Sequence, residues 1–333
     1  MRLTTPRLEI EEGNAFEQDA LDRKKFGVSL MNLVSRSDDA LVIALNAPWG
    51  EGKTTFIKMW QGLLKENNVN SIYFDAFEND YVDDAFIAIA SQIVSFIEME
   101  LSSTSSAKKN LKDLKKNAAK VGAQLLTWTV KLGIKAATLG VINASDIEAL
   151  NDIKSDLAKD TSEVLSKYVQ ERIQSHKKNV QSIKSFKDTL SATADIIRQE
   201  TGKPLIIIID ELDRCKPTYA VEIIEKIKHL FSVPNVVFIL VMHKPQLEEA
   251  VKSVYGQGVN ANIYLQKFIN IECSLPKNID PRNINDYRRY CNRLYQLHKL
   301  ETWNDKPGLL NSVTALARHF DLSLRELEKC FTY

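Results

Sequence analysis

A glycine-rich turn carries the residues with the clearest chemical use. The apolar run Leu41–Leu45 ends at Asn46, and Ala47-Pro48-Trp49-Gly50-Glu51-Gly52-Lys53-Thr54-Thr55 follows as a helical pattern begins. A glycine turn between a strand and a helix points successive backbone N–H groups inward, where they cradle phosphate oxygens. We expect all of Ala47–Thr55 to bind a nucleotide, with Lys53 reaching the terminal phosphates and the Thr54 hydroxyl coordinating Mg²⁺.

The turn departs from the usual phosphate-binding pattern at one position. That pattern places its first glycine where this chain has Ala47. Because an L side chain at positive φ strains a loop, we expect Ala47 to have a negative φ. The alternative interpretation is a glycine turn that only caps an ordinary helix.

Two adjacent carboxylates provide the second half of a nucleotide site. Asp210 and Glu211 end the run Leu205–Ile209, whose β-branched side chains are typical of a strand buried on both faces. Mg²⁺ needs a carboxylate at a strand tip near the turn, so Asp210 is the predicted metal ligand beside Thr54. Glu211 is the predicted base that orients the attacking water. A solvated strand end is the alternative.

Three further polar residues are candidates for the reaction itself. His243 follows the apolar run Val236–Met242, and we expect it to sense the γ-phosphate; a structural histidine is the alternative. Arg214 and Arg325 are candidate charge clamps for the transition state, where arginine contributes roughly 10³–10⁵ in rate. For each arginine, a surface ion pair is the alternative.

The elements that must position these residues alternate along the chain. We predict helices over Asp19–Val34, from Lys53 to about Lys65, and from Asp83, Pro217, Pro245, Asp280 and Ser323, with strands at Leu41–Leu45, Ile72–Asp75, Leu205–Ile209, Val236–Met242 and Ile269–Leu275. Ser323 and Glu326 have the spacing of a capping box. This alternation predicts an α/β fold with a parallel sheet.

Residues 102–203 show no strand pattern, and we expect a helical insertion there. Within it, Lys108–Lys120 is a basic stretch, and Val121–Ile142 is apolar over nearly the length of a membrane span. Lys131 and Lys135 interrupt it, and each costs roughly 2.5–3.5 kcal/mol at mid-bilayer. A helix buried in the protein or covered by a partner, an interfacial membrane helix and a true span remain the alternatives.

The composition is that of an ordinary soluble protein. The chain has 333 residues, is 44% hydrophobic and 26% charged, and carries a formal net charge of +1, which gives no overall bias toward nucleic acid. Cys215, Cys273, Cys291 and Cys330 lack metal-site spacing and indicate no disulfide framework. Since Met1–Gly13 lacks the apolar core of a signal peptide, we expect a reduced, cytoplasmic environment.

Several motifs together resemble the KAP family of P-loop NTPases. They are Pro48-Trp49-Gly50-Glu51-Gly52-Lys53-Thr54, Tyr73-Phe74-Asp75-Ala76-Phe77-Glu78, Ile209-Asp210-Glu211-Leu212-Asp213-Arg214-Cys215, Asn235-Val236-Val237-Phe238 and Tyr264-Leu265-Gln266-Lys267-Phe268. The resemblance implies an ASCE-type P-loop NTPase core, with an added strand between the Walker A and Walker B strands. It also implies ATP and Mg²⁺, and the preference for ATP over GTP rests on it alone. The residues that depart from the family's usual ones are Ala47, Asp75, Phe77, His243 and Glu211, which keeps a carboxylate where the family often has Asp.

On this basis we divide the chain into the N-terminal part of the NTPase core (1–101), the insertion (102–203), the C-terminal part of the core (204–278) and a small helical C-terminal piece (279–333). The expected activity is Mg²⁺-dependent ATP hydrolysis that drives a conformational or assembly switch. The family's association with phage exclusion suggests antiviral defence. The alternatives are a nucleotide-binding scaffold with negligible turnover and an ATPase stimulated by nucleic acid, which rests on Lys108–Lys120. Expected partners are another copy of the chain or another protein, and a membrane surface through the insertion.

Overall fold

A parallel sheet of five strands forms the centre of the molecule. The computed structural model describes residues 13–100 except 18, 38, 83 and 84, residues 183–277 except 229 and 231, and residues 284–332 except 301–305. The strands are β1 (Leu41–Asn46), β2 (Ser71–Asp75), β3 (Leu205–Asp210), β4 (Val236–Met242) and β5 (Ile271–Ser274). They pair in parallel in the order β2-β3-β4-β1-β5. β4 therefore lies between β1 and β3, which confirms the predicted added strand.

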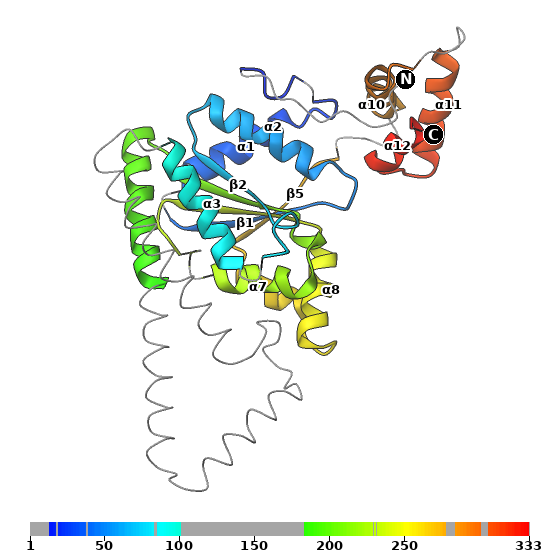
Figure 1. The fold of residues 1–333 in the computed structure, drawn as a ribbon. Helices are drawn as coiled ribbons and strands as arrows, with labels where there is room; N and C mark the ends of the chain where they lie inside the picture. Colours follow the sequence, from blue (N-terminus) through cyan, green and yellow to red (C-terminus); the bar gives the residue numbers. More distant parts are fainter. Residues whose placement is uncertain are drawn as a thin grey trace, which may run out of the picture.

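Helices cover both faces of this sheet (Figure 1). α1 (Lys24–Ser35) and α2 (Lys53–Glu66) pack on one face, against side chains of β1, β3 and β4. The other face carries α3 (Ala85–Glu100), α7 (Pro217–Ile227), α8 (Lys244–Tyr255), α9 (Ala261–Gln266) and a helix over 183–201. Because both faces are covered, every residue of β3 and β4 is buried, which explains their uninterrupted apolar runs.

The last part of the predicted insertion belongs to this second layer of helices. Phe186, Leu190 and Ile197 of the helix over 183–201 are fully or almost fully buried in the core. The basic stretch 108–120 and the apolar stretch 121–142 lie outside the described residues, so the alternatives for them stay open. Among the helices that the structure describes, none is long and apolar enough to cross a membrane.

Three C-terminal helices form a small separate cluster. They are α10 (Ile284–Leu297), α11 (Lys306–His319) and α12 (Leu324–Cys330). Their buried side chains pack with Leu21, which precedes α1. The predicted capping box is confirmed, since the Ser323 hydroxyl accepts the amide of Glu326 and the Glu326 carboxylate accepts the amide of Ser323 at 2.8 Å. Figure 1 shows this cluster beside the core, with α12 nearest to it.

The first helix begins later than the sequence predicts. We expected a helix over Asp19–Val34, but α1 starts at Lys24. The Asp19 carboxylate accepts the backbone N–H groups of Leu21, Arg23 and Lys24, and it thereby satisfies amides that would otherwise be unpaired at a helix start. Aspartate competes for backbone donors in this way just ahead of helices, so the residues from 19 to 23 form the approach to α1.

Candidate nucleotide-binding site

The glycine-rich turn has the backbone that a phosphate cradle requires. It joins β1 to α2, and Lys53 is the first residue of α2. Gly50 has a φ of +82° and Gly52 a φ of +73°, a conformation that L side chains rarely adopt. Ala47 does not have a positive φ, as predicted.

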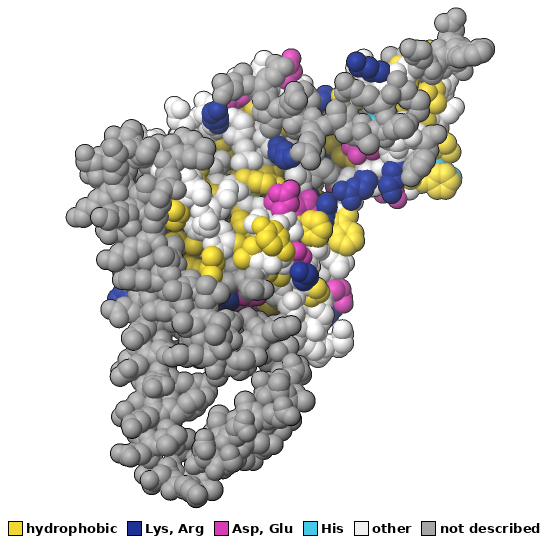
Figure 2. All heavy atoms as spheres, viewed as in Figure 1, with side chains coloured by type: hydrophobic (Ala, Val, Ile, Leu, Met, Phe, Trp, Pro, Cys, Tyr) yellow, Lys and Arg dark blue, Asp and Glu magenta, His cyan; other side chains and the backbone are white. Residues whose placement is uncertain are grey.

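A cavity of about 250 Å³ opens between this turn and the C-terminal helices. Its walls include Pro48, Gly50, Gly52, Lys53, Thr54 and Thr55 of the turn, Leu21 and Arg23 ahead of α1, Glu211 and Arg214 after β3, and Tyr290, Arg293, Leu294, Leu297 and Arg325 from the C-terminal piece. Figure 2 shows basic side chains gathered where the C-terminal helices meet the core, with acidic and hydrophobic side chains beside them. Phosphate-binding groups on one wall and apolar side chains on another suit a nucleotide.

The ammonium group of Lys53 is buried at the base of the turn. Its Nζ donates to the carbonyl oxygens of Ala47 at 2.9 Å and Pro48 at 3.4 Å, and it lies 3.8 Å from Oδ2 of Asp213. Burial lowers the pKa of Lys53, and the nearby carboxylates of Asp213 and Glu211 oppose that shift.

Of the two predicted acids, Glu211 makes a direct hydrogen bond to the turn. The Thr54 hydroxyl donates to Oε1 of Glu211 at 2.7 Å, so the residue after the lysine and the end of β3 are in direct contact. Asp210 accepts the amide of Glu211 at 2.8 Å and the hydroxyl of Tyr73 at 3.1 Å. Glu211 has a φ of +61°, a conformation that a non-glycine residue keeps only where its surroundings hold it.

These acids and Thr54 form an oxygen-rich group that fits Mg²⁺. Mg²⁺ is a hard cation that binds one or two carboxylates together with phosphate oxygens and water. Burial, and after it the neighbouring Glu211, raises the pKa of Asp210 to about 6. A divalent cation at the Asp210 carboxylate would offset this cost of holding two negative charges together. Thr54 and Asp210 are therefore the candidate metal ligands.

The three further candidates occupy different positions. Arg214 forms an ion pair through Nε with Oε2 of Glu211; because Glu211 is buried, this is not the surface ion pair considered as the alternative. Arg325 lines the cavity, and its amide donates to the carbonyl of Gly50 at 3.2 Å. His243 does not line the cavity; its ring packs edge-on against Trp49 at 5.8 Å between centroids, and burial lowers its pKa. Their catalytic roles stay predictions.

Two residues that sequence reasoning did not assign make hydrogen bonds to the turn. Asp213 accepts the indole N–H of Trp49. Arg23 is almost fully buried, and it donates from Nε to the carbonyl of Pro276 at 2.7 Å and from Nη1 to the carbonyl of Glu51 at 2.9 Å. Asp213 belongs to the motif after β3, and this motif indicated that it could be part of the site. Arg23 is a lone arginine ahead of a helix, and such a residue gives no indication of a role.

The predicted binding segment does not point all of its side chains into the cavity. Ala47 is buried in the core, Trp49 turns to Asp213, and the Glu51 carboxylate lies 3.6 Å from Nζ of Lys277. These three are absent from the cavity wall, whereas the rest of the segment lines it. In a phosphate-binding turn the backbone N–H groups do the binding, so side chains at such positions are available to brace the turn.

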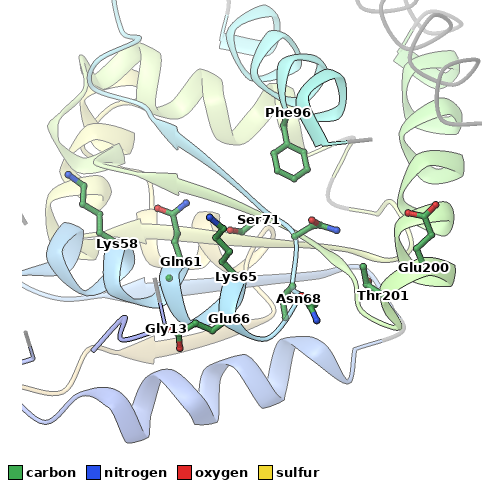
Figure 3. Close-up of a pocket in the computed structure, with 13 residues that line it drawn as sticks. Gly13, Lys58, Gln61, Lys65, Glu66, Asn68, Ser71, Phe96, Glu200 and Thr201 are labelled. Carbon is green, nitrogen blue, oxygen red and sulfur yellow. The ribbon is translucent and has the colours of Figure 1, made fainter. Parts of the chain in front are cut away.

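A larger hollow of about 1000 Å³ lies at the other end of α2 (Figure 3). Lys58, Gln61, Lys65 and Glu66 line it together with residues near the start of β2 and the end of the helix over 183–201. It contains no residue of the glycine-rich turn and neither of the acids after β3. Chemistry therefore favours the smaller cavity as the functional site.

Comparisons with known proteins find similarity to a protein family and to two individual proteins. The family model described as the KAP family P-loop domain matches residues 23–331. The uncharacterized protein MJ0182 of Methanocaldococcus jannaschii is 29% identical over 184 residues, covering 51% of this chain and 88% of that protein. The ORC2 protein of Aeropyrum pernix in its ADP form aligns with a TM-score of 0.41 and 13% identity, covering 98% of this chain and 64% of that one. Its ADPNP–ADP complexes give a TM-score of 0.36 and 14% identity, covering 98% and 68%. This chain thus spans less than two thirds of the ADP-form chain.

Proposed function

Because the chain belongs to the KAP family of P-loop NTPases, we propose that it binds ATP with Mg²⁺ and hydrolyses it to drive a conformational or assembly switch. The observation that carries this proposal is the hydrogen bond of 2.7 Å from Thr54 to Glu211. It joins the phosphate-binding turn to the acids after β3, so that Lys53, Thr54, Asp210 and Glu211 form one group. These are the residue types that nucleotide hydrolysis needs.

Each member of the group has a distinct proposed role. The turn's backbone N–H groups and Lys53 bind the phosphates, and Thr54 and Asp210 hold the metal, which neutralises developing charge when bound. Glu211 accepts the proton of the attacking water. Arg325, which lines the cavity beside Gly50, stabilises charge on the transferred phosphoryl group, and Arg214 holds Glu211 through its ion pair.

Slow turnover fits this geometry best. Glu211 contacts both the Thr54 hydroxyl and the Arg214 guanidinium, so an attacking water must share the carboxylate with these two groups. We propose that these contacts rearrange before turnover, as in a switch. A nucleotide-binding scaffold with negligible turnover is the second candidate, favoured by the same two contacts.

The test is Glu211→Gln, with Glu249→Gln as the matched control. Glu249 is an exposed glutamate on α8 that pairs with Lys252, so its loss removes a carboxylate far from the cavity. A general base contributes about 10²–10⁴ in rate, so Glu211→Gln should bind ATP while phosphate release falls at least about a hundredfold. Turnover that survives in Glu211→Gln would remove the base assignment. ATP binding without phosphate release in the unmodified protein would favour the scaffold.

The biological process is a further part of the proposal. Family likeness supports a role in antiviral defence, exerted through another copy of the chain, a partner protein or a membrane surface. Phage plating on a bacterial host that expresses the protein or its Lys53→Ala variant tests this role. Equal plating on both strains would argue against it.

A further inference from the structure

Asp213 is a buried carboxylate that contacts the glycine-rich turn at two points. Its Oδ2 accepts the indole N–H of Trp49, and the same oxygen lies 3.8 Å from Nζ of Lys53. The side chain has no exposed surface, and its other oxygen, Oδ1, is buried without a hydrogen-bond partner. The proposed reaction assigns no role to Asp213.

Local structure explains why this side chain turns inward. β3 ends at Asp210, Glu211 takes a left-handed conformation, and a short 3₁₀ turn covers Leu212–Arg214 before α7 begins at Pro217. Leu212 packs into the core beneath the sheet, and Asp213 is buried with it. The reversal after the strand thus places a third carboxylate beside Lys53.

A buried carboxylate is costly unless it is paired with a cation or with hydrogen-bond donors. Here the donors are one indole N–H and, at a longer distance, the ammonium group of Lys53. The remaining contacts of that ammonium group are backbone carbonyls. Among the residues that the structure describes, Asp213 is therefore the carboxylate paired with the ammonium group that would bind a terminal phosphate, and a phosphate would compete with it for that group.

Trp49 links Asp213, for whose cation Lys53 a phosphate would compete, to the protein surface. Its side chain packs edge-on against His243, yet the residue is 45% exposed. One oxygen of Asp213 accepts the indole N–H of Trp49 and also lies near the ammonium group of Lys53. A phosphate that binds Lys53 therefore changes the electrostatic environment of this oxygen and, through it, of the indole.

We infer that Asp213 is a positioning residue of the nucleotide site, which holds Lys53 and Trp49 through one carboxylate oxygen and couples phosphate binding at Lys53 to the exposed indole. The identity of the ligand rests on the proposed function, whereas the coupling among the three residues does not. The coupling is therefore testable without nucleotide.

The first experiment is a double-mutant cycle in the absence of nucleotide. Asp213→Asn, Lys53→Met and the double variant are compared by urea unfolding, with Asp195→Asn replacing Asp213→Asn in a control cycle. Asp195 is a carboxylate on the helix over 183–201 that accepts an amide hydrogen of Asn235 at 2.7 Å. We expect the Asp213 and Lys53 effects to be coupled by at least fivefold in the folding equilibrium constant, and the Asp195 and Lys53 effects to be additive. Additive effects in both cycles would overturn the inference.

The second experiment follows the emission of Trp49, taken as the difference between each protein and its Trp49→Phe counterpart. Lys53→Met alone should change this emission without nucleotide, because Asp213 then loses its cation. This variant serves even where Asp213→Asn fails to fold. Unchanged Trp49 emission in Lys53→Met would contradict the coupling.

The same emission then tests the link to the ligand. MgADP should change the Trp49 signal of the unmodified protein, and the change should fall at least threefold in Asp213→Asn at saturating MgADP. An equal response in Asp213→Asn would overturn the inference. If the unmodified protein binds neither MgADP nor MgATP in equilibrium dialysis, the proposed function fails, and the nucleotide-free cycle still decides the role of Asp213.

Discussion

Gly50 of the glycine-rich turn contacts the start of α12, and Gly50→Ala tests that contact. A Cβ atom at this position would lie 3.0 Å from both Cβ of Arg325 and Oγ of Ser323. Both neighbours belong to the start of α12, and the Arg325 amide is bound to the Gly50 carbonyl at 3.2 Å. The substitution therefore requires the start of α12 to shift by a few tenths of an ångström, which strains this hydrogen bond.

The expected cost has two parts. An L residue in the left-handed region costs about 1–2 kcal/mol, and Gly50 has a φ of +82°. Weakening of the hydrogen bond from Arg325 adds at most about 0.5–1.5 kcal/mol. Gly202→Ala is the matched control, because Gly202 has a φ of +71° and a Cβ there would meet nothing within 4 Å. Gly202→Ala should show only the first part.

Two measurements separate these contributions. Urea unfolding should show a larger loss of stability for Gly50→Ala than for Gly202→Ala. Amide hydrogen exchange in residues 323–331 should rise in Gly50→Ala and stay unchanged in Gly202→Ala, because local opening exposes the amides of α12. If both variants lose the same stability and exchange in α12 is unchanged, then the contact between Gly50 and the start of α12 does not stabilise the protein.

Three further predictions concern stability. Ser323→Ala removes the hydroxyl that accepts the Glu326 amide, and it should cost about 0.5–2 kcal/mol with faster exchange in the first turn of α12. Leu240→Ala in β4, whose side chain is fully buried, should cost about 2–5 kcal/mol in urea unfolding. Asp321→Asn should destabilise the protein at pH 7. The hydrogen bond from Lys277 lowers the pKa of Asp321, so this contribution is present above about pH 4 and disappears as acid titrates the carboxylate, which unfolding curves from pH 7 to pH 2 would reveal.

Sequence patterns predicted the parts of the fold that depend on local composition. β3 and β4 were recognisable because a strand covered by helices on both faces must be apolar throughout. The turn was recognisable because two of its residues need φ above zero, a need that glycine meets. The capping box of Ser323 and Glu326 was recognisable because the side chain and the amide that pair are three residues apart.

Contacts between distant parts of the chain were not predictable in this way. Arg23 donates to Pro276, 253 positions away, and to Glu51, and nothing in the local pattern of α1 indicates either partner. The inward direction of Asp213 depends on a 3₁₀ turn whose rotation follows from how Leu212 packs, and a sequence motif does not state that rotation. Charged residues become buried where tertiary packing provides their partners, and single-sequence reasoning has no access to that packing.

The same distant contacts fix the backbone of the glycine-rich turn. Arg325 donates its amide to the carbonyl of Gly50, and Arg23 donates its guanidinium to the carbonyl of Glu51. In a planar trans peptide the C=O and the following N–H point in opposite directions. Holding these two carbonyls therefore also fixes the directions of the amides of Glu51 and Gly52. Arg23 and Arg325 thus order the turn before a nucleotide binds, which lowers the entropy that a bound nucleotide must remove.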